Sequence, residues 1–210
     1  METEVRRPRI GVLALQGDYA AHAEALLDAG AIPSLVKNPE DLCLQDQSLD
    51  GLIMPGGEST TMLKFLERRN LFDSLKDFAV SRPVFGTCAG AILLAREVHH
   101  PTQRSLGLLD AVVERNAYGR QIDSSILSEP TALPGGPLEM VFIRAPRITK
   151  TGPAVEVLAR REGFPVLVRQ ENLLAATFHP ELSEDRRVHR HFVEMVLASR
   201  NVNVNQPEHA

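Results

Sequence analysis

Short apolar segments alternate with longer segments of helical periodicity in the first part of the chain. The apolar segments are rich in Val, Ile and Leu and carry little charge, which is typical of strands buried on both faces of a sheet. Strands are expected at residues 9–15, 33–37, 51–55 and 83–85, and helices at 19–29, 60–69, 71–81 and 91–98. This alternation predicts a doubly wound, flavodoxin-like α/β fold with three α/β/α layers and a mostly parallel central sheet.

The second part of the chain has a different pattern, in which strands follow one another directly. Strands are expected at residues 106–114, 140–145, 155–160, 165–169 and 173–178, without a clear helix between them. They predict added antiparallel strands or a small side sheet. The proline- and glycine-rich segment 124–137 is expected to be a loop. Apolar residues at helical spacing predict a closing amphipathic helix over 185–199.

A single domain accounts for the whole chain, because no repeat, linker or low-complexity block interrupts it. We expect this domain to span residues 1–210, with its core at about 9–199 and a polar tail at 200–210. The 210 residues are 43% hydrophobic and 24% charged, so the chain can bury a sizeable core without metal or disulfide cross-links.

The charge and the cysteine content limit the classes of partner and the cellular compartment that we expect. A net charge of −4 argues against nucleic acid as the main partner, since phosphate backbones call for a strongly basic surface. Neither a secretory signal nor the ~18 apolar residues of a spanning helix are found, so we expect a cytoplasmic protein without a membrane partner. Cys43 and Cys88 form no zinc-binding motif, and neither a metal nor a cofactor is expected.

The segment Gly86-Thr-Cys88-Ala-Gly90 has the pattern of a nucleophile elbow with cysteine as the nucleophile. It connects an apolar strand to a helix, through a turn so tight that its flanking residues must be very small. The helix N-terminus favours the thiolate, and the N–H of Ala89 points to where an oxyanion would form. A lone cysteine is more often a packing residue, which is how we interpret Cys43. The two glycines favour a catalytic role for Cys88.

A base for this thiol is expected in the His-Pro-Glu segment at residues 179–181, which follows an apolar strand. In extended chain the side chains i and i+2 project to the same side, so Glu181 can reach the ring of His179 and set its tautomer. The strand ends share one edge of the sheet, which places His179 near Cys88. The alternative is a loop histidine beside a solvated glutamate. The other histidines lack this arrangement: His99 and His100 are expected in a loop, His189 and His191 face apart on a helix, and His22 and His209 stand alone.

Further residues near strand ends are candidates for oxyanion and substrate binding. The pair Gly56-Gly57 lets the backbone approach a ligand and offers N–H donors, although most glycine pairs are ordinary turns. Arg115 and Arg144 carry guanidinium groups that suit a substrate carboxylate, although an arginine at a strand end is usually solvated. With a thiolate and an oriented histidine, these residues indicate acyl transfer through a thioester.

The motifs resemble those of the class I, or triad, glutamine amidotransferases, which combine a Gly-x-Cys-x-Gly elbow with His-Pro-Glu. Four more segments narrow the resemblance to the glutaminase subunits of pyridoxal 5′-phosphate synthases, over about residues 9–199. These segments are Leu15-Gln-Gly-Asp18, Pro55-Gly-Gly-Glu-Ser-Thr60, Glu114-Arg-Asn-Ala-Tyr-Gly-Arg120 and Phe142-Ile-Arg-Ala-Pro146.

The resemblance implies that the chain hydrolyses L-glutamine to L-glutamate and ammonia. Cys88 would attack the side-chain amide, His179 would transfer the proton, and Glu181 would orient His179. The implied oxyanion hole consists of Gly56, Gly57 and Ala89. The implied glutamine-binding residues are Gly56, Gly57, Glu58, Arg115, Ile143 and Arg144.

The implied partner is a (β/α)₈-barrel synthase subunit, which would activate the glutaminase on docking and use its ammonia to make pyridoxal 5′-phosphate (vitamin B6). One alternative is the glutaminase of another amidotransferase, such as imidazole glycerol phosphate synthase. The segments at residues 55–60 and 115–120 argue against it. Another is a regulatory module without activity, which the presence of Cys88, His179 and Glu181 disfavours.

Overall fold

The computed structural model describes residues 6–43, 48–115 and 125–204, except the side chains of 202–204. Its main sheet contains five parallel strands: β1 (Arg9–Leu13), β2 (Ile32–Val36), β3 (Gly51–Met54), β4 (Val84–Thr87) and β12 (Leu173–Ala176). Two antiparallel strands, β10 (Glu156–Arg161) and β11 (Phe164–Gln170), extend it beyond β12.

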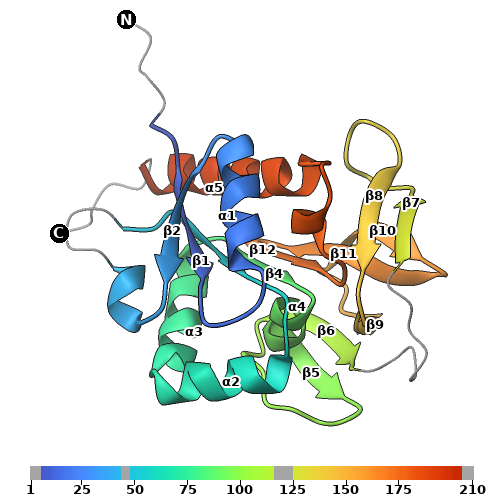
Figure 1. Cartoon of the computed structure of the whole chain (residues 1–210), viewed down its shortest axis with the longest axis horizontal. Helices are drawn as coiled ribbons and strands as arrows, with labels where there is room; N and C mark the ends of the chain where they lie inside the picture. The colour runs from blue at the N-terminus through green and yellow to red at the C-terminus, as the bar shows by residue number, and fades with distance from the viewer. Residues whose placement is uncertain (1–5, 44–47, 116–124, 205–210) are drawn as a thin grey trace, which may run out of the picture.

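The strand order across the main sheet is β10-β11-β12-β4-β3-β1-β2 (Figure 1). The parallel part, β2-β1-β3-β4-β12, has the 2-1-3-4-5 order of flavodoxin-like folds, with β12 as the fifth strand. The predicted fold class is therefore confirmed.

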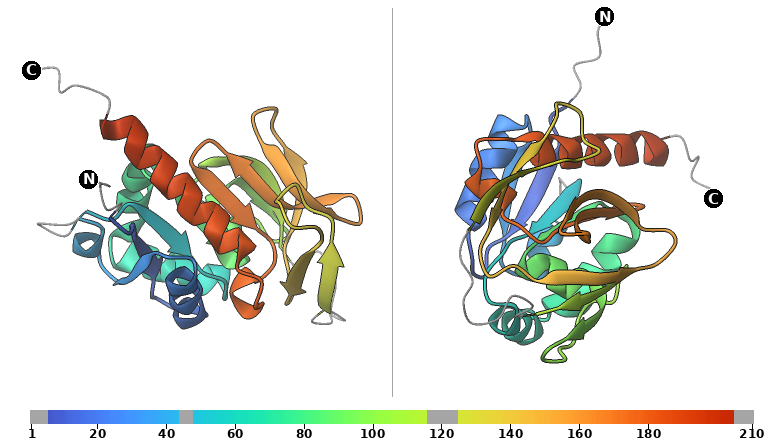
Figure 2. Two further views of the ribbon diagram at one scale, coloured as in Figure 1. Left: turned by 90° about the horizontal axis from the view of Figure 1, so that it is seen from above. Right: turned by 90° about the vertical axis from the view of Figure 1, so that its right-hand side faces the viewer.

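Helices cover both faces of this sheet (Figure 2). One face packs against α1 (Tyr19–Asp28) and α5 (Arg187–Val204), and the other against α2 (Ser59–Arg68), α3 (Leu71–Ser81) and α4 (Ala89–Leu94). Side chains alternate between the two cores: Ile53 of β3 lies in the core with α1 and α5, whereas Leu52 and Met54 lie in the other. Burial on both faces explains why these strands are almost wholly apolar.

The second part of the chain adds the antiparallel strands that the sequence predicts. Besides β10 and β11, a side sheet is formed by β5 (Ala95–His99), β6 (Leu109–Glu114) and β9 (Arg147–Thr151), in which β6 pairs in parallel with β5 and antiparallel with β9. A separate antiparallel ribbon is formed by β7 (Ser125–Glu129) and β8 (Leu138–Phe142). Two short 3₁₀ helices complete the described elements, η1 (Pro39–Leu42) and η2 (Pro180–Leu182).

Two predictions of local structure are wrong. The helix expected at 91–98 ends at Leu94, and the residues after it form β5, which pairs with β6. Strand pairing with a distant segment outweighs local propensity here, and Val98 is buried by it. The expected loop at 124–137 contains β7, whose backbone pairs with β8; its proline and glycine content lies after the strand.

Other differences concern an element that was not predicted and the end of a helix. The strand β9 has only one fully buried side chain, Ile148, so its sequence lacks an apolar signal. The last helix runs on to Val204, beyond the predicted end at 199 and into the segment expected to be a polar tail. Residues 205–210 of that tail lie outside the described part of the chain.

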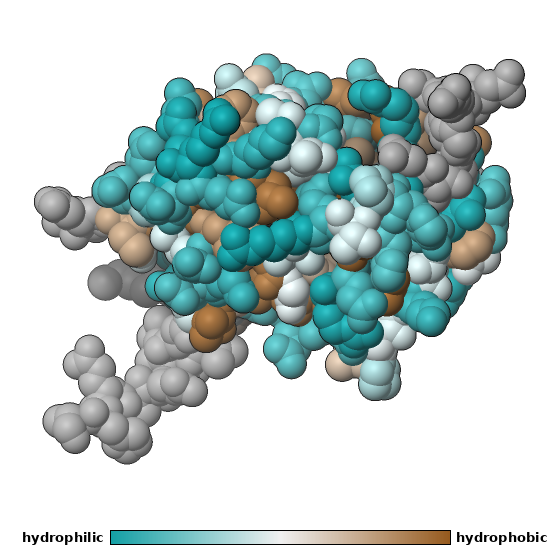
Figure 3. Space-filling view, turned by 90° about the horizontal axis from the view of Figure 1, so that it is seen from below, coloured by the Kyte–Doolittle hydropathy of each residue, from teal (hydrophilic) through white to brown (hydrophobic). Residues whose placement is uncertain are grey.

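The surface below α2 and α3 is dominated by hydrophilic side chains, with hydrophobic ones scattered among them (Figure 3). This is the expected outer side of amphipathic helices that bury their apolar faces against the sheet. No helix among the described residues is long and apolar enough to span a bilayer.

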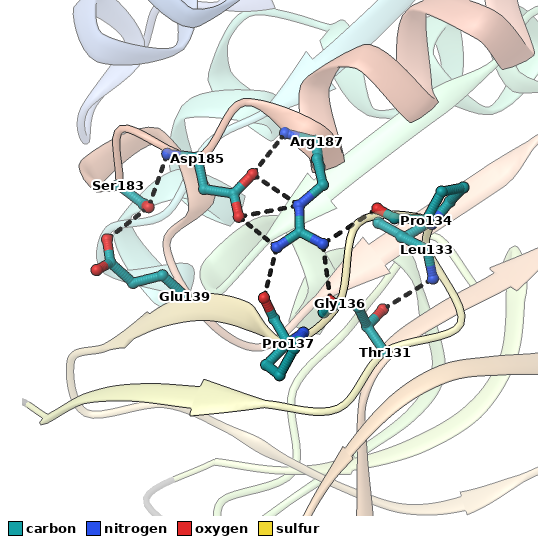
Figure 4. A network of polar contacts seen from close by, with 9 residues as sticks. All are labelled: Thr131, Leu133, Pro134, Gly136, Pro137, Glu139, Ser183, Asp185 and Arg187. Carbon is teal, nitrogen blue, oxygen red and sulfur yellow. Dashed lines mark hydrogen bonds and ion pairs between the residues drawn. The ribbon is translucent and has the colours of Figure 1, made fainter.

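An arginine at the start of α5 joins the chain after η2 to the loop before β8 (Figure 4). The Arg187 guanidinium binds the Asp185 carboxylate at 2.6 and 3.0 Å and donates to the backbone oxygens of Pro134, Gly136 and Pro137 at 2.6–3.1 Å. Hydrogen bonding from Arg187 holds the pKa of Asp185 below its usual value. Both β8 and η2 adjoin residues that line the cavity described below. The contact of Arg187 therefore holds these two segments in a fixed relative position.

We expect Arg187→Lys to lower the free energy of unfolding by about 1–2 kcal/mol, because an ammonium cannot reproduce a fork that binds a carboxylate and three carbonyls. Denaturant unfolding measures this change. Arg160→Lys is the matched control, since Arg160 donates to only one carbonyl, that of Gly163. Equal stability of the two variants would contradict the clamping role of Arg187.

Candidate active site

The carboxyl ends of three adjacent strands bring the predicted site residues together. Cys88 directly follows β4, Gly56 follows β3 and His179 follows β12. The strands are in register, with Met54 opposite Gly86 and Ala176 opposite Thr87. A cavity of about 270 Å³ opens here. Its lining residues are Gly57, Glu58, Ser59, Cys88, Ile92, Arg115, Ile143, Arg144 and His179.

The backbone at Cys88 forms the sharp turn that the elbow motif predicts. Cys88 has φ +47° and ψ −101°, a conformation that L-residues rarely adopt. A Cβ at Gly90 would lie 2.0 Å from the Met54 oxygen, and a Cβ at Gly86 would lie 2.6 Å from the Gly90 carbonyl carbon. Both flanking positions therefore require glycine. The helix that follows, α4, is short, but it starts at Ala89, directly behind the sulfur.

The histidine and glutamate of the second motif form a buried pair. The Nδ1 atom of His179 lies 2.8 Å from Oε1 of Glu181, and both residues are buried. Because an ionised carboxylate only accepts, Nδ1 carries the proton and Nε2 is left for the sulfur. Burial disfavours the charged ring, but hydrogen bonds to Cys88 and Glu181, together with their charges, raise the pKa of His179 to about 10.

The glycine pair lies directly against these groups. A Cβ at Gly56 would lie 2.5 Å from Cε1 of His179 and 3.3 Å from Cβ of Cys88. Gly57 has φ +132°, a region that favours glycine, and Gln16 packs beside it. The side-chain amide of Gln16 donates to the Glu58 backbone oxygen and so fixes the chain after the glycines. The structure thus gathers all three predicted oxyanion residues, with Ala89 as the third, around Cys88.

Glu58 and Arg115 lie on one side of the cavity and contact each other. The Glu58 carboxylate caps α2 by accepting from the backbone N–H groups of Thr60 and Thr61 at 3.0 and 2.7 Å. Burial is the largest single effect and disfavours the charged form, but the hydrogen bond from the Thr61 hydroxyl at 2.6 Å, together with those from Thr60 and from the Thr61 backbone, lowers the pKa of Glu58 to about 2. Arg115 donates to Thr60 Oγ1 at 3.0 Å and lies 3.4 Å from Glu58. Residues 116–120 of its motif lie outside the described part of the chain.

Arg144 and Ile143 line the cavity from the end of β8. Arg144 has φ +44°, follows the buried strand and is exposed, so its guanidinium is accessible to a ligand. The chain turns out of the sheet after Phe142, so the strand predicted for 140–145 ends before both residues.

Two histidines for which no role was expected lie behind this site. His22 of α1 and His189 of α5 are both fully buried, with His22 Nδ1 3.0 Å from His189 Nε2. His22 Nε2 lies 3.0 Å from Thr87 Oγ1 and 3.3 Å from Glu181 Oε2. The expectation that His22 stands alone is therefore wrong. His22 is far along the sequence from Thr87, Glu181 and His189, so no local motif predicts these contacts.

A second cavity, of about 400 Å³, lies between η1 and α3 and contains Cys43. Among the described residues that line it there is no histidine to activate a thiol. We therefore locate the chemistry in the smaller cavity, where Cys88 and His179 meet.

Comparison with known proteins agrees with this fold. A model of the SNO glutamine amidotransferase family matches residues 12–198. The chain therefore belongs to the SNO glutamine amidotransferase family, as the resemblance of its motifs predicts.

Two relatives with high sequence identity are named as a subunit of one particular enzyme. The chain is 56% identical over 188 residues to pyridoxal 5′-phosphate synthase subunit PdxT of Koribacter versatilis, covering 90% of this chain and 95% of that protein. It is 50% identical over 190 residues to the subunit of the same name from Thermotoga neapolitana, covering 90% and 99%.

Solved structures give the same result for the fold. A crystal structure of a glutamine amidotransferase, 47% identical, superposes with a TM-score of 0.81 and covers 89% of this chain and 98% of its own. A putative GMP synthase subunit from Thermoplasma acidophilum, 17% identical, has a TM-score of 0.68 over 95% and 98% of the two chains and shares the fold alone.

The raised pKa of His179 sets the sign of a pH dependence. A group with a higher pKa in the folded than in the unfolded state stabilises the fold fully below its unfolded value, near 6.5, and this contribution is lost as the pH rises towards about 10. We expect NMR titration to place the pKa of His179 well above 6.5. Glu181→Gln should lower it, because the carboxylate charge is lost, whereas the distant His191→Gln should not. A His179 that titrates at or below 6.5 in the wild-type chain would contradict this description of the site.

Proposed function

We propose that this chain is the glutaminase subunit of a pyridoxal 5′-phosphate synthase, and that Cys88, His179 and Glu181 are its catalytic triad. It hydrolyses L-glutamine to L-glutamate and ammonia, and a synthase subunit consumes the ammonia. The observation that carries the proposal is the contact of an elbow cysteine with a buried His–Glu pair inside a cavity. The family and the names of the relatives support the substrate and the pathway.

The reaction proceeds by two acyl transfers on Cys88. The thiolate attacks the side-chain amide carbon of glutamine, and the resulting oxyanion is stabilised by backbone N–H donors from Ala89 and the Gly56–Gly57 pair. His179, protonated at neutral pH, gives its Nε2 proton to the leaving nitrogen, so that ammonia departs and a thioester remains. His179 then takes a proton from water as the water attacks the thioester, which releases glutamate and restores the thiolate.

The other cavity residues bind the amino-acid end of glutamine. Arg144, exposed at the cavity rim, is suited to the α-carboxylate, and Arg115 adds positive charge beside it. Glu58 holds Arg115 through the contact at 3.4 Å and offers a negative charge near the α-ammonium group. Ile143, together with the glycine pair, bounds the slot for the side chain.

We further propose that the synthase subunit is a (β/α)₈ barrel, that docking activates the glutaminase, and that both proteins work in the cytoplasm. The family resemblance of the motifs supports the barrel and the activation. The cytoplasmic location is supported by Cys43 and Cys88, which are both free thiols, as is usual in a reducing compartment. If the chain is instead the glutaminase of another amidotransferase, the synthase subunit of that enzyme should activate it.

The nucleophile is tested by Cys88→Ala. We expect glutamate formation from L-glutamine, measured with the barrel subunit present, to fall at least about 10⁴-fold, since the thioester can no longer form. The fold should be retained, as shown by an unchanged circular dichroism spectrum. Cys43→Ala serves as the control and should keep full activity. Turnover that persists in Cys88→Ala would exclude the mechanism.

The binding residues are tested by Arg144→Ala. Loss of a charged hydrogen bond to the substrate carboxylate should raise the KM for glutamine about 10-fold while kcat changes little. Arg160→Ala, remote from the cavity, is the control. If kcat falls and KM stays constant, Arg144 acts on the reacting atoms and not on substrate binding.

A further inference from the structure

The buried ring of His22 connects the strand end that carries Cys88 with the turn that carries Glu181. It comes from α1, and its Nε2 atom lies between Thr87, the last residue of β4, and the Glu181 carboxylate of η2. The helices α1 and α5 lie side by side on this face of the sheet (Figure 1). His189 of α5 contacts the Nδ1 side of the His22 ring. Four elements therefore meet at His22.

Such a cluster has to be fully paired to be stable, because a buried polar atom without a partner costs about 1–3 kcal/mol. His22 and His189 have no exposed surface, and Glu181 is only 4% exposed. Burial, followed by the charges of His189 and His179, holds the pKa of His22 well below its usual value. Burial likewise lowers the pKa of His189 to about 3, so both rings are neutral and carry one proton each.

Two atoms at the ends of the cluster decide where these protons are. Among the described residues, Glu181 Oε2 and His189 Nδ1 are buried without a hydrogen bond of good geometry. If His22 were protonated on Nδ1, its Nε2 lone pair would face Oε2 at 3.3 Å, and His189 would have to carry its proton on the unpartnered Nδ1. In that arrangement the Nδ1–H of His189 would be a buried donor without an acceptor, and Glu181 Oε2 would face a lone pair.

The opposite tautomer pairs every donor. Protonated on Nε2, His22 donates its N–H to Thr87 Oγ1 and presents it to Glu181 Oε2 3.3 Å away, while its Nδ1 accepts from the Nε2–H of His189. The Nδ1 lone pair of His189 then remains without a partner, and a buried acceptor is left unpaired more often in proteins than a buried N–H. With His179 bound to Oε1, each oxygen of the Glu181 carboxylate then faces a ring N–H, at 2.8 Å for Oε1 and at 3.3 Å for Oε2.

We propose that His22, held by His189 in the Nε2–H tautomer, is a positioning residue that fixes the Glu181 carboxylate against His179 and ties it to the strand end that carries Cys88. This role rests on the proposed glutaminase function. Glu181 sits on a 3₁₀ turn of three residues, and its contact with His22 links that turn to the core. Without the His22 N–H, the buried Oε2 atom would lose the donor that faces it at 3.3 Å, and the carboxylate would turn towards another donor, misaligning His179.

The tautomer is tested directly on the ¹⁵N-labelled wild-type chain, without any need for activity. Long-range ¹H–¹⁵N correlation spectra at neutral pH should show both His22 and His189 as Nε2–H tautomers. His22→Leu should shift or broaden the downfield Nδ1–H resonance of His179. A His22 found as the Nδ1–H tautomer, or an unchanged His179 resonance in His22→Leu, would overturn the proposal.

The kinetic test uses the chain together with the barrel synthase subunit. We expect His22→Leu to lower kcat by up to about 100-fold with little change in KM, because the substrate-binding residues are untouched while the base is displaced. His22→Gln, whose amide N–H₂ reaches about as far as Nε2, should restore most of kcat even if it is less stable. A purely structural role predicts the opposite, with activity following stability in both variants.

The matched control is His191→Leu. His191 lies on the same helix as His189, but its charged neighbours are Arg169, Glu194 and Glu156 and not the triad. It should keep full kcat. If the wild-type mixture hydrolyses no glutamine, the proposed function fails, and the tautomer measurement still decides the role of His22. If the wild type is active and His22→Leu keeps full kcat, only the positioning role is wrong.

Discussion

The tight turn at Cys88 is the constraint on which the rest of the structure depends. A positive φ at a non-glycine residue is costly and persists only where the surrounding structure enforces it. Here the enforcement comes from β4 on one side, held in register between β3 and β12, and from α4 on the other. Glycine at positions 86 and 90 is the local condition, because a methyl group at either would strike backbone atoms.

The same constraint explains where the charged groups lie. The buried edge of the sheet holds the Glu181 carboxyl group, the His179 ring and the Cys88 sulfur close together, and two neutral histidines complete the cluster. Buried charges are stable only when paired and hydrogen-bonded, so removing one member should leave the others unpaired. Glu181 is central to this balance because it contacts His179 through one oxygen and His22 through the other.

Much of the fold and most of the candidate site could be predicted from the sequence, since both depend on local patterns. The apolar strands, the elbow glycines and the i, i+2 spacing of His179 and Glu181 are properties of short segments. The structure gathers all the predicted site residues at one edge of the sheet. The strand β5 was predicted as helix because its pairing with β6 is a tertiary effect. The pairing of His22 with His189, 167 residues apart, has no local signature at all.

The most direct test of the account is which cysteine reacts with a glutamine analogue that carries an electrophilic carbon in place of the amide carbon. The chain has two cysteines, Cys43 exposed and Cys88 buried. Peptide mass spectrometry of the chain with the barrel subunit should find one label, on the buried Cys88, with loss of activity and protection by L-glutamine. Labelling of Cys43 instead, or loss of activity while Cys88 remains unlabelled, would contradict the central claim that the elbow thiol is the nucleophile.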